Sequence, residues 1–208
     1  MIDPTVGSRL TSLDVRKCSE EVTESLLSWV FSSAEPNRNL TSLNVSFCPS
    51  AVVLPVLSRL PELRKLNLSY CHIPGNCSLQ SFHNLQNLEW LELRGNRTRG
   101  EQLLELSKLV GKNLHYLGLA STLVTDNDLR NLAEMFPVLK TLDLSECVQV
   151  TDAILIEWYN KHKDKIWPKL RKLVLKGCLH IRRRVVDCVR LKTRNQLVVD
   201  WWFVISCC

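Results

Sequence analysis

The sequence predicts an α/β solenoid, in which short parallel strands and helices alternate along one row of repeats. Two observations carry this prediction. One nine-residue phrase, Leu-x-x-Leu-x-Leu/Val-x-x-Cys or a close variant, occurs seven times. The starts of neighbouring phrases are separated by 30, 23, 25, 26, 25 and 31 residues. A period of about 20–29 residues with this phrase is typical of the leucine-rich repeat, whose units stack and bury a shared core.

The seven phrases are numbered here by position, the first leucine being position one. They are Leu10–Cys18, Leu40–Cys48, Leu63–Cys71, Leu88–Asn96, Leu114–Thr122, Leu139–Cys147 and Leu170–Cys178. Their apolar residues alternate, as in Leu43 and Val45, and a period of two indicates a short strand with one buried face. We therefore predict a right-handed arc of about seven repeats, with parallel strands on the concave face and helices on the convex face.

The segments between the phrases carry helical spacing. Three helical sets are Val22, Leu26, Leu27 and Val30; Leu103, Leu104, Leu106 and Leu109; and Leu129, Leu132, Ala133 and Phe136. Thr125-Asp126 and Thr151-Asp152 are N-cap candidates with an acid in the first turn. Residues 63–87 should hold only a brief turn, because Pro74 and Gly75 interrupt them.

We predict a single domain over residues 1–208. Its repeats cover about 10–180, and residues 181–208 form a basic and apolar C-terminal cap or tail. Within that tail, 191–199 should give an irregular final strand, and Trp201-Trp202-Phe203 should pack over the last repeat. The first strand needs a cover on its outer face. We expect either residues 1–9 with a partner domain to provide it, or the chain to be a piece of a longer protein.

The cysteines favour a reducing compartment. Five of the nine occupy position nine of a phrase, where a buried thiol can fill the turn after the strand. Such thiols would form a ladder that points in one direction, rather than disulfides. The N-terminus has no apolar signal segment and no run approaches membrane-spanning length, so a cytoplasmic or nuclear protein is expected. Five glycosylation sequons, from Asn39 to Asn96, are attributed to chance for the same reason.

The repeats resemble a particular subtype. Cys147, Val150, Thr151, Asp152, Leu170, Leu173, Leu175 and Cys178 match in order the cysteine-containing leucine-rich repeat. That repeat is similar to those of F-box/leucine-rich repeat proteins, the substrate receptors of cullin-based ubiquitin ligases. The resemblance covers about residues 10–180 and implies substrate recognition, with cullin-ligase linker proteins as further partners. The F-box itself is not visible in the sequence, where nine residues precede the first leucine.

The concave face can be predicted from the spacing, because positions three, five and seven point outward and position eight lies beside them. Exposed aromatic and charged residues gather on the central repeats. The predicted protein-binding residues are Phe47, Lys65, Asn67, Tyr70, Trp90, Glu92, Arg94, Tyr116 and Asp143. Aromatic residues and arginine ringed by polar groups are typical of protein-binding hot spots. The alternative is that Phe47 and Tyr70 fold over the sheet edge and only pad it.

Charge is concentrated near the C-terminal end. Residues 161–195 hold 13 Lys and Arg against two acidic residues, whereas the whole chain has a net charge of +6. The predicted basic patch consists of Arg182, Arg183, Arg184, Arg190, Lys192 and Arg194. It could meet nucleic acid, anionic lipid or an acidic partner. No nucleic-acid motif accompanies it, so a solvated convex face and tail is the favoured interpretation.

Catalytic motifs are weak in this sequence. Cys178 and Arg184 have the Cys-x5-Arg spacing of a tyrosine-phosphatase loop, but the segment between them lacks the glycines of a phosphate cradle. Cys71, His72 and Cys77 do not supply two spaced pairs of zinc ligands. We expect no enzyme and no cofactor. The three functions left open are a ligase substrate receptor, a free-standing scaffold or regulatory protein, and a membrane-associated adaptor that uses the basic end and a modified Cys207-Cys208.

Overall fold

The computed structural model describes residues 9–30, 37–74, 77–130, 132–161, 169–193 and 197–202. Eight parallel strands form one sheet, and each pairs with its neighbours in chain order. The strands are β1 (Ser12–Asp14), β2 (Ser42–Asn44), β3 (Lys65–Asn67), β4 (Trp90–Glu92), β5 (Tyr116–Gly118), β6 (Thr141–Asp143), β7 (Lys172–Val174) and β8 (Val198–Asp200). Each of the first seven strands occupies positions three to five of a phrase.

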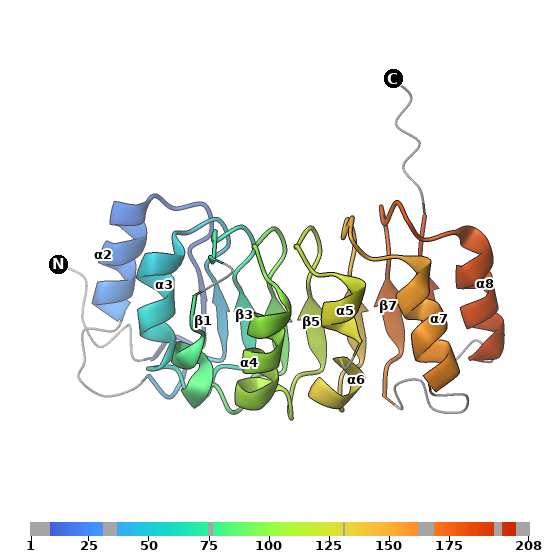
Figure 1. The fold of residues 1–208 in the computed structure, drawn as a ribbon. Helices are drawn as coiled ribbons and strands as arrows, with labels where there is room; N and C mark the ends of the chain where they lie inside the picture. The colour runs from blue at the N-terminus through green and yellow to red at the C-terminus, as the bar shows by residue number, and fades with distance from the viewer. Residues whose placement is uncertain are drawn as a thin grey trace, which may run out of the picture.

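The helices form a second layer on one side of this sheet, as Figure 1 shows. They are α2 (Glu20–Val30), α3 (Ser50–Leu57), the 3₁₀ helix η1 (Gln80–Asn84), α4 (Gly100–Val110), α5 (Asp126–Leu129), α6 (Leu132–Met135), α7 (Asp152–Lys161) and α8 (Arg183–Lys192). Neighbouring helices contact one another along the row, for example α2 with α3 and α7 with α8. The opposite side of the sheet, the concave face, carries no helix within the described residues.

The strands pair in strict register. Leu43 lies opposite Leu66, Leu91 opposite Leu117, and Leu142 opposite Leu173. Residues at one position of the phrase therefore form a row across the sheet, with a spacing of about 4.8 Å between strands. Because side chains alternate along a strand, a row points either into the core or out from the concave face.

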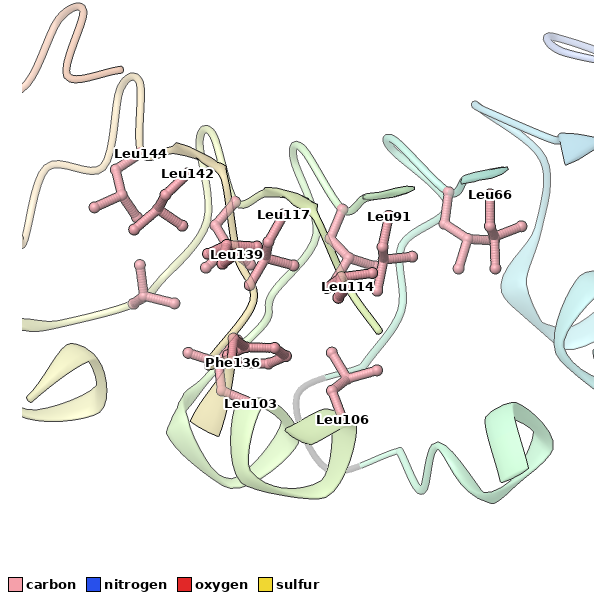
Figure 2. Close-up of a cluster of buried hydrophobic side chains, with 14 of the residues drawn as sticks. Leu66, Leu91, Leu103, Leu106, Leu114, Leu117, Phe136, Leu139, Leu142 and Leu144 are labelled. Atoms are coloured by element: carbon pink, nitrogen blue, oxygen red, sulfur yellow. The ribbon is translucent and has the colours of Figure 1, made fainter. Parts of the chain in front are cut away.

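The inward rows are leucine and valine, and they form the core. Positions one, four and six supply them, and from the second repeat onward nearly all are fully buried. Figure 2 shows Leu66, Leu91, Leu117 and Leu142 side by side in the position-four row, with Leu103, Leu106 and Phe136 on the helix side. The core thus runs along the solenoid rather than closing around one centre, as in other repeat proteins.

The two ends of the described sheet differ. In the first repeat Leu10, Leu13 and Cys18 are only partly buried, because β1 has a partner strand on one side only. At the other end, the repeat pattern continues past residue 180. Residues 183–192 form α8, although a strand was expected from residue 191, and the strand itself is β8. Val186 and Val189 are buried and three residues apart, a helical spacing that explains the difference.

The predicted helices are confirmed in place but not in every detail. The segment around Leu129 and Phe136 forms two short helices, α5 and α6, rather than one. Two members of the helical sets are exposed, Val22 on α2 at 47% and Leu104 on α4 at 44%, whereas Leu103 and Leu106 face the core. The brief turn predicted for residues 63–87 is η1. Trp201 packs partly buried against the core, Trp202 is exposed, and Phe203 lies outside the described residues.

The position-nine residues form the expected ladder. Each of four thiols donates to the position-six carbonyl of the preceding repeat: Cys48 to Val15 at 3.2 Å, Cys71 to Val45 at 3.1 Å, Cys147 to Leu119 at 3.1 Å and Cys178 to Leu144 at 3.0 Å. Where asparagine stands instead, Asn96 makes the same bond to Leu68 at 2.8 Å. The seven cysteines in the described part of the chain are unbridged. Thus each thiol joins two neighbouring repeats.

Helix starts also join repeats. Thr125 caps α5 in a reciprocal capping box with Asp128, as the Thr-Asp pattern predicts. The neighbouring Asp126 accepts from the backbone N–H of Thr151 at 2.9 Å, one repeat further on. Asp152 repeats this contact with the N–H of Arg182, also at 2.9 Å. These carboxylates therefore tie the start of one helix to the next repeat.

Removing one leucine of the position-four row should destabilise the whole chain. We expect Leu117→Ala to lower the free energy of unfolding by about 2–5 kcal/mol, because it leaves a cavity between two repeats. Leu104→Ala is the matched control, since that side chain is 44% exposed, and it should cost only about 0.5 kcal/mol. Urea denaturation monitored by circular dichroism measures both. Equal losses for the two variants would contradict the assigned core.

The ladder thiols should be chemically inert in the folded protein. Burial raises the pKa of Cys71 and of Cys178 to about 12, and the thiolate is the form that is alkylated. At about pH 8, iodoacetamide should therefore modify the exposed Cys188 and leave Cys71 and Cys178 unmodified, as read by peptide mass spectrometry. In denaturant all three should react. If Cys71 in the folded protein reacted as fast as Cys188, the ladder thiols would be accessible to solvent and their assigned burial would be wrong.

Candidate functional site on the concave face

Two parallel aromatic rings lie at the middle of the concave face. Trp90 on β4 and Tyr116 on β5 occupy position three and lie opposite each other in the register. Their ring centroids are 4.7 Å apart with an angle of 11° between the planes. Both side chains are half-buried. The sheet therefore holds two large rings in one fixed orientation.

Glu92 anchors this stack from position five. Its carboxylate accepts a hydrogen bond from the Tyr116 hydroxyl at 2.7 Å and another from the backbone N–H of Arg94 at 3.1 Å. Burial raises the pKa of Glu92, while these two hydrogen bonds oppose the rise. Burial and the nearby Glu92 carboxylate also raise the pKa of Tyr116. The tyrosine is therefore a neutral donor, and its ring cannot rotate away without breaking this bond.

Arg94 reaches across several repeats. Its guanidinium lies 3.4 Å from the carboxylate of Glu146 and 4.0 Å from that of Asp143, both two repeats further on. On the opposite side the Tyr70 side chain, one repeat before, raises the pKa of Arg94 together with Glu146 and Asp143, against the lowering effect of burial. Arg94 thus connects residues from the third to the sixth repeat.

Small residues of the fifth repeat make this reach possible. Gly118 and Ala120 occupy positions five and seven there. A Cβ atom on Gly118 would lie 2.1 Å from a carboxylate oxygen of Glu92. The carboxylate therefore occupies the space that a side chain at Gly118 would need. The small residues at these two positions were the signal in the sequence that a neighbouring side chain could occupy the space over the fifth repeat.

A second aromatic pair lies on the turn that follows the strands. Phe47 and Tyr70, both at position eight, stack with ring centroids 4.7 Å apart and an interplanar angle of 17°. The ammonium group of Lys17 lies 5.4 Å from the Phe47 ring centroid. Tyr70 in turn covers Gly95, where an added Cβ would lie 2.3 Å from the tyrosine ring. Phe47 remains 48% exposed.

Position eight has an unusual backbone conformation. In all seven repeats its φ is positive, between 54° and 71°. The residues are Lys17, Phe47, Tyr70, Gly95, Ser121, Glu146 and Gly177. Their N–H groups donate to position-seven carbonyls of the next repeat, as Phe47 does to Ser69 at 2.8 Å. Positive φ favours glycine, yet only two of the seven are glycine, so the other side chains are placed on the turn at a conformational cost.

The structure brings together most of the predicted concave-face residues. We call Phe47, Tyr70, Trp90, Glu92, Arg94 and Tyr116 the central patch. Asp143 lies at the edge of the patch, with its carboxylate 4.0 Å from the Arg94 guanidinium, and accepts a hydrogen bond from the backbone N–H of Ser145 at 2.9 Å. Lys65 and Asn67 lie beside the patch and line a groove of about 350 Å³ that Trp90 also borders. Glu146 was missed, and the position-eight rule that found Phe47 and Tyr70 would have included it.

The predicted basic patch is partly neutralised by acidic neighbours. Arg182 pairs with Asp152, and both Arg183 and Arg190 pair with Asp187, at 3.6 and 3.4 Å. Arg190 also donates to the backbone carbonyl of Val199 at 2.5 Å. Arg184 is exposed. The Lys192 side chain and Arg194 lie outside the described residues, as do Cys207 and Cys208.

The spacing that resembles a phosphatase loop does not form a nucleophilic site. Cys178 is buried, its thiol donates to Leu144 at 3.0 Å, and burial raises its pKa to about 12. Arg184 instead lines a hollow between α7 and α8. Among the described residues, no three His, Cys, Asp or Glu side chains are grouped to hold a metal ion. No described helix is both long and apolar enough to cross a membrane.

Known proteins share this architecture. Residues 37–49 match the model of the Leucine Rich repeat family. A chain of the Rad7 and Elc1 complex from yeast superimposes with a TM-score of 0.60 at 19% identity, covering 93% of this chain and 55% of that one. An internalin (inlF) from Listeria monocytogenes gives a TM-score of 0.60 at 19% identity, covering 95% and 49%. This chain spans about half the length of the two solved structures.

These likenesses confirm the fold class. The chain is a leucine-rich repeat solenoid of the α/β class, as the repeat phrase predicts. Its repeats resemble the cysteine-containing repeats of the F-box/leucine-rich repeat receptors. At 19% identity the two solved structures show the fold alone.

Because the pKa of Glu92 is raised in the folded state, its contribution to folding stability should depend on pH. Between the ordinary value of 4.5 and the raised one, the folded state holds the proton more tightly than the unfolded state. This carboxyl therefore contributes less stability as pH rises through that window. We expect the unfolding free energy of Glu92→Gln, minus that of the wild type, to increase from about pH 4 to about pH 7. Urea titrations at each pH measure it.

Subtracting the unfolding free energy of the wild type removes the pH-dependent contribution of all groups that titrate equally in both proteins. Glu101→Gln, at an exposed position on α4, controls for the loss of any carboxylate. A Glu92→Gln difference that stays constant or shrinks with pH would contradict the burial of this carboxyl.

Proposed function

We propose that this chain is a non-catalytic protein-binding module, and that the central patch on its concave face holds a protein target. The observation that carries the proposal is the pair of aromatic stacks, Phe47 with Tyr70 and Trp90 with Tyr116. The Tyr70 side chain lies close enough to Arg94 to raise its pKa, and the Arg94 backbone N–H donates to Glu92 at 3.1 Å. Aromatic and arginine side chains dominate the energetics of protein interfaces.

The rings are held in place before any target arrives. The Tyr116–Glu92 hydrogen bond and both stacking contacts restrict side-chain rotation in the free protein. A target that packs on these rings therefore pays less of the ordering entropy that interface side chains usually cost. This supports binding by a preformed surface.

The position of the Phe47–Tyr70 pair favours target binding over the alternative, that these rings only pad the edge of the sheet. Both have positive φ, a conformation that costs an L-residue about 1–2 kcal/mol. Glycine closes the same turn at Gly95 and Gly177. Phe47 is also 48% exposed, so it covers little of the protein itself. Since Lys17, Ser121 and Glu146 have the same positive φ, the exposure of the large Phe47 ring, rather than its backbone, is the observation that supports an external contact.

For the cellular role, we propose target recognition for a cullin-type ubiquitin ligase. Support comes from the cysteine-containing repeats, and from the shared fold with a chain crystallised in the Rad7 and Elc1 complex. The buried, unbridged thiols suit the reducing cytoplasm or nucleus. The second candidate is a free-standing scaffold or regulatory protein, because the central patch alone is sufficient to occupy a partner's surface.

Affinity purification from cells tests the target site and the ligase role together. Trp90→Ala with Tyr116→Ala should remove the captured target, since each hot-spot residue contributes about 2 kcal/mol or more, about thirtyfold in Kd. Trp202→Ala is the matched control, because Trp202 is also an exposed tryptophan and follows β8 at the far end of the sheet. Quantitative mass spectrometry compares the three samples, and thermal unfolding checks that each variant folds.

The identity of the co-purified proteins separates the two roles. A cullin or its linker protein among the captured proteins supports the ligase role, and a target without them supports the scaffold. Unchanged capture by the folded double variant would overturn the central patch as the binding site.

A further inference from the structure

We propose that the concave face over the first three repeats receives an acidic side chain of the bound protein, held by Lys65 next to Trp90. This inference rests on the proposed function, because it describes part of the same target. It adds the chemistry of that target: a carboxylate-bearing segment that continues onto the central patch.

The site is a groove of about 350 Å³ on the strands β1 to β4. Its lining includes Asp14, Ser42, Asn44, Lys65, Asn67 and Trp90. We call it the N-terminal groove. Its side chains are short except at one end, where Lys65 and Trp90 are neighbours in the strand register. Trp90 therefore belongs both to this groove and to the central patch.

The carboxylate and side-chain amide oxygens of the groove are already occupied. Asp14 forms an ion pair with Arg16 at 2.8 Å and accepts from the amide of Asn44 at 3.2 Å. The Asn44 side-chain oxygen accepts from the N–H of Ser46 at 3.1 Å. The Asn67 oxygen accepts from both the N–H and the hydroxyl of Ser69, at 2.9 and 2.7 Å. The charge of Asp14 is also balanced by Arg16.

Several donors, in contrast, remain free. Within the described part of the chain, the Lys65 ammonium, the Asn67 amide nitrogen and the Trp90 indole N–H make no hydrogen bond or ion pair. Lys65 is exposed, and a lysine side chain offers donors but no acceptor. A groove whose carboxylate and amide oxygens are occupied and whose donors are free suits a ligand group that only accepts, and an ionised carboxylate is such a group.

The neighbouring carboxylate of Glu92 does not fulfil this role. Glu92 lies opposite Asn67 in the register, but its carboxylate is turned toward the fifth repeat. There it accepts from Tyr116 and occupies the space over Gly118. Lys65 therefore stays uncompensated, and a basic group of the target would be repelled from the groove.

The strand spacing also sets the distance between the target's contact with Lys65 and its contact with Trp90. Adjacent strands lie about 4.8 Å apart, and an extended chain advances about 3.3 Å per residue. An acidic residue above Lys65 on β3 would thus place one of the next two residues over the ring of Trp90 on β4. We therefore expect an Asp or Glu followed or preceded closely by an apolar residue.

Selection from a random peptide library displayed on phage tests this inference on the full chain. Wild-type protein should enrich peptides with an Asp or Glu within two residues of an apolar side chain. For the best enriched peptide, Lys65→Glu should weaken binding by about tenfold or more, because it turns a charge-assisted contact into a repulsion. Isothermal titration calorimetry measures the Kd.

Lys172→Glu is the matched control. Lys172 occupies the same position three on β7 and is also exposed, but it lies outside the groove. It should change the affinity by less than about threefold, the effect of a distant surface charge. Equal weakening by Lys65→Glu and Lys172→Glu would reduce the contact to general charge attraction and overturn the inference.

The remaining outcomes separate the two proposals. Enriched peptides without acidic residues that still need Trp90 would overturn the groove inference and leave the central patch intact. Acidic peptides that bind equally well to the Trp90→Ala, Tyr116→Ala double variant would overturn the central patch. A synthetic peptide that binds only when the acidic residue is replaced by phosphoserine would overturn the carboxylate assignment in favour of a phosphorylated target.

Discussion

In-register pairing of eight parallel strands is the constraint on which the rest of the structure depends. It converts each position of the repeated phrase into a row that crosses the sheet. Inward rows become continuous lines of leucine and valine, and the row at position nine becomes a ladder of thiols that bond the preceding repeat. Backbone N–H groups at position eight extend this pairing through the turns. Each repeat is therefore stabilised by its neighbours rather than by itself.

The same register organises the concave face. It sets Trp90 against Tyr116 and Phe47 against Tyr70, so ordinary sequence positions become two ring stacks. It also makes the small residues of the fifth repeat important, because Gly118 leaves the space that Glu92 fills. Arg94 then reaches acids two repeats away. The proposed target contacts follow from this pattern: rings in the centre, and a donor-rich groove around Lys65 at the N-terminal side.

The stable and the functional parts of the chain use different rows. Core leucines and four of the ladder thiols are buried. Burial raises the pKa of Cys71 and Cys178 to about 12, so these thiols stay in the unreactive protonated form. Residues proposed for binding lie on the opposite side of the same strands. A change at Trp90 or Lys65 can therefore alter recognition with little effect on the core, which is what makes the proposed variants informative.

By itself, the sequence determined the fold class, the strand positions, the core rows and the outward residues, because all of these follow from one repeated phrase with a period of two inside it. It also located Trp90, Tyr116, Phe47 and Tyr70 as candidates. Tertiary structure alone decided which side chains meet, namely the reach of Arg94 to Glu146 and the orientation of Glu92 toward Tyr116. The physical reason is that these contacts join residues 24 to 52 positions apart, and local spacing carries no information about how side chains from different repeats divide the space between them.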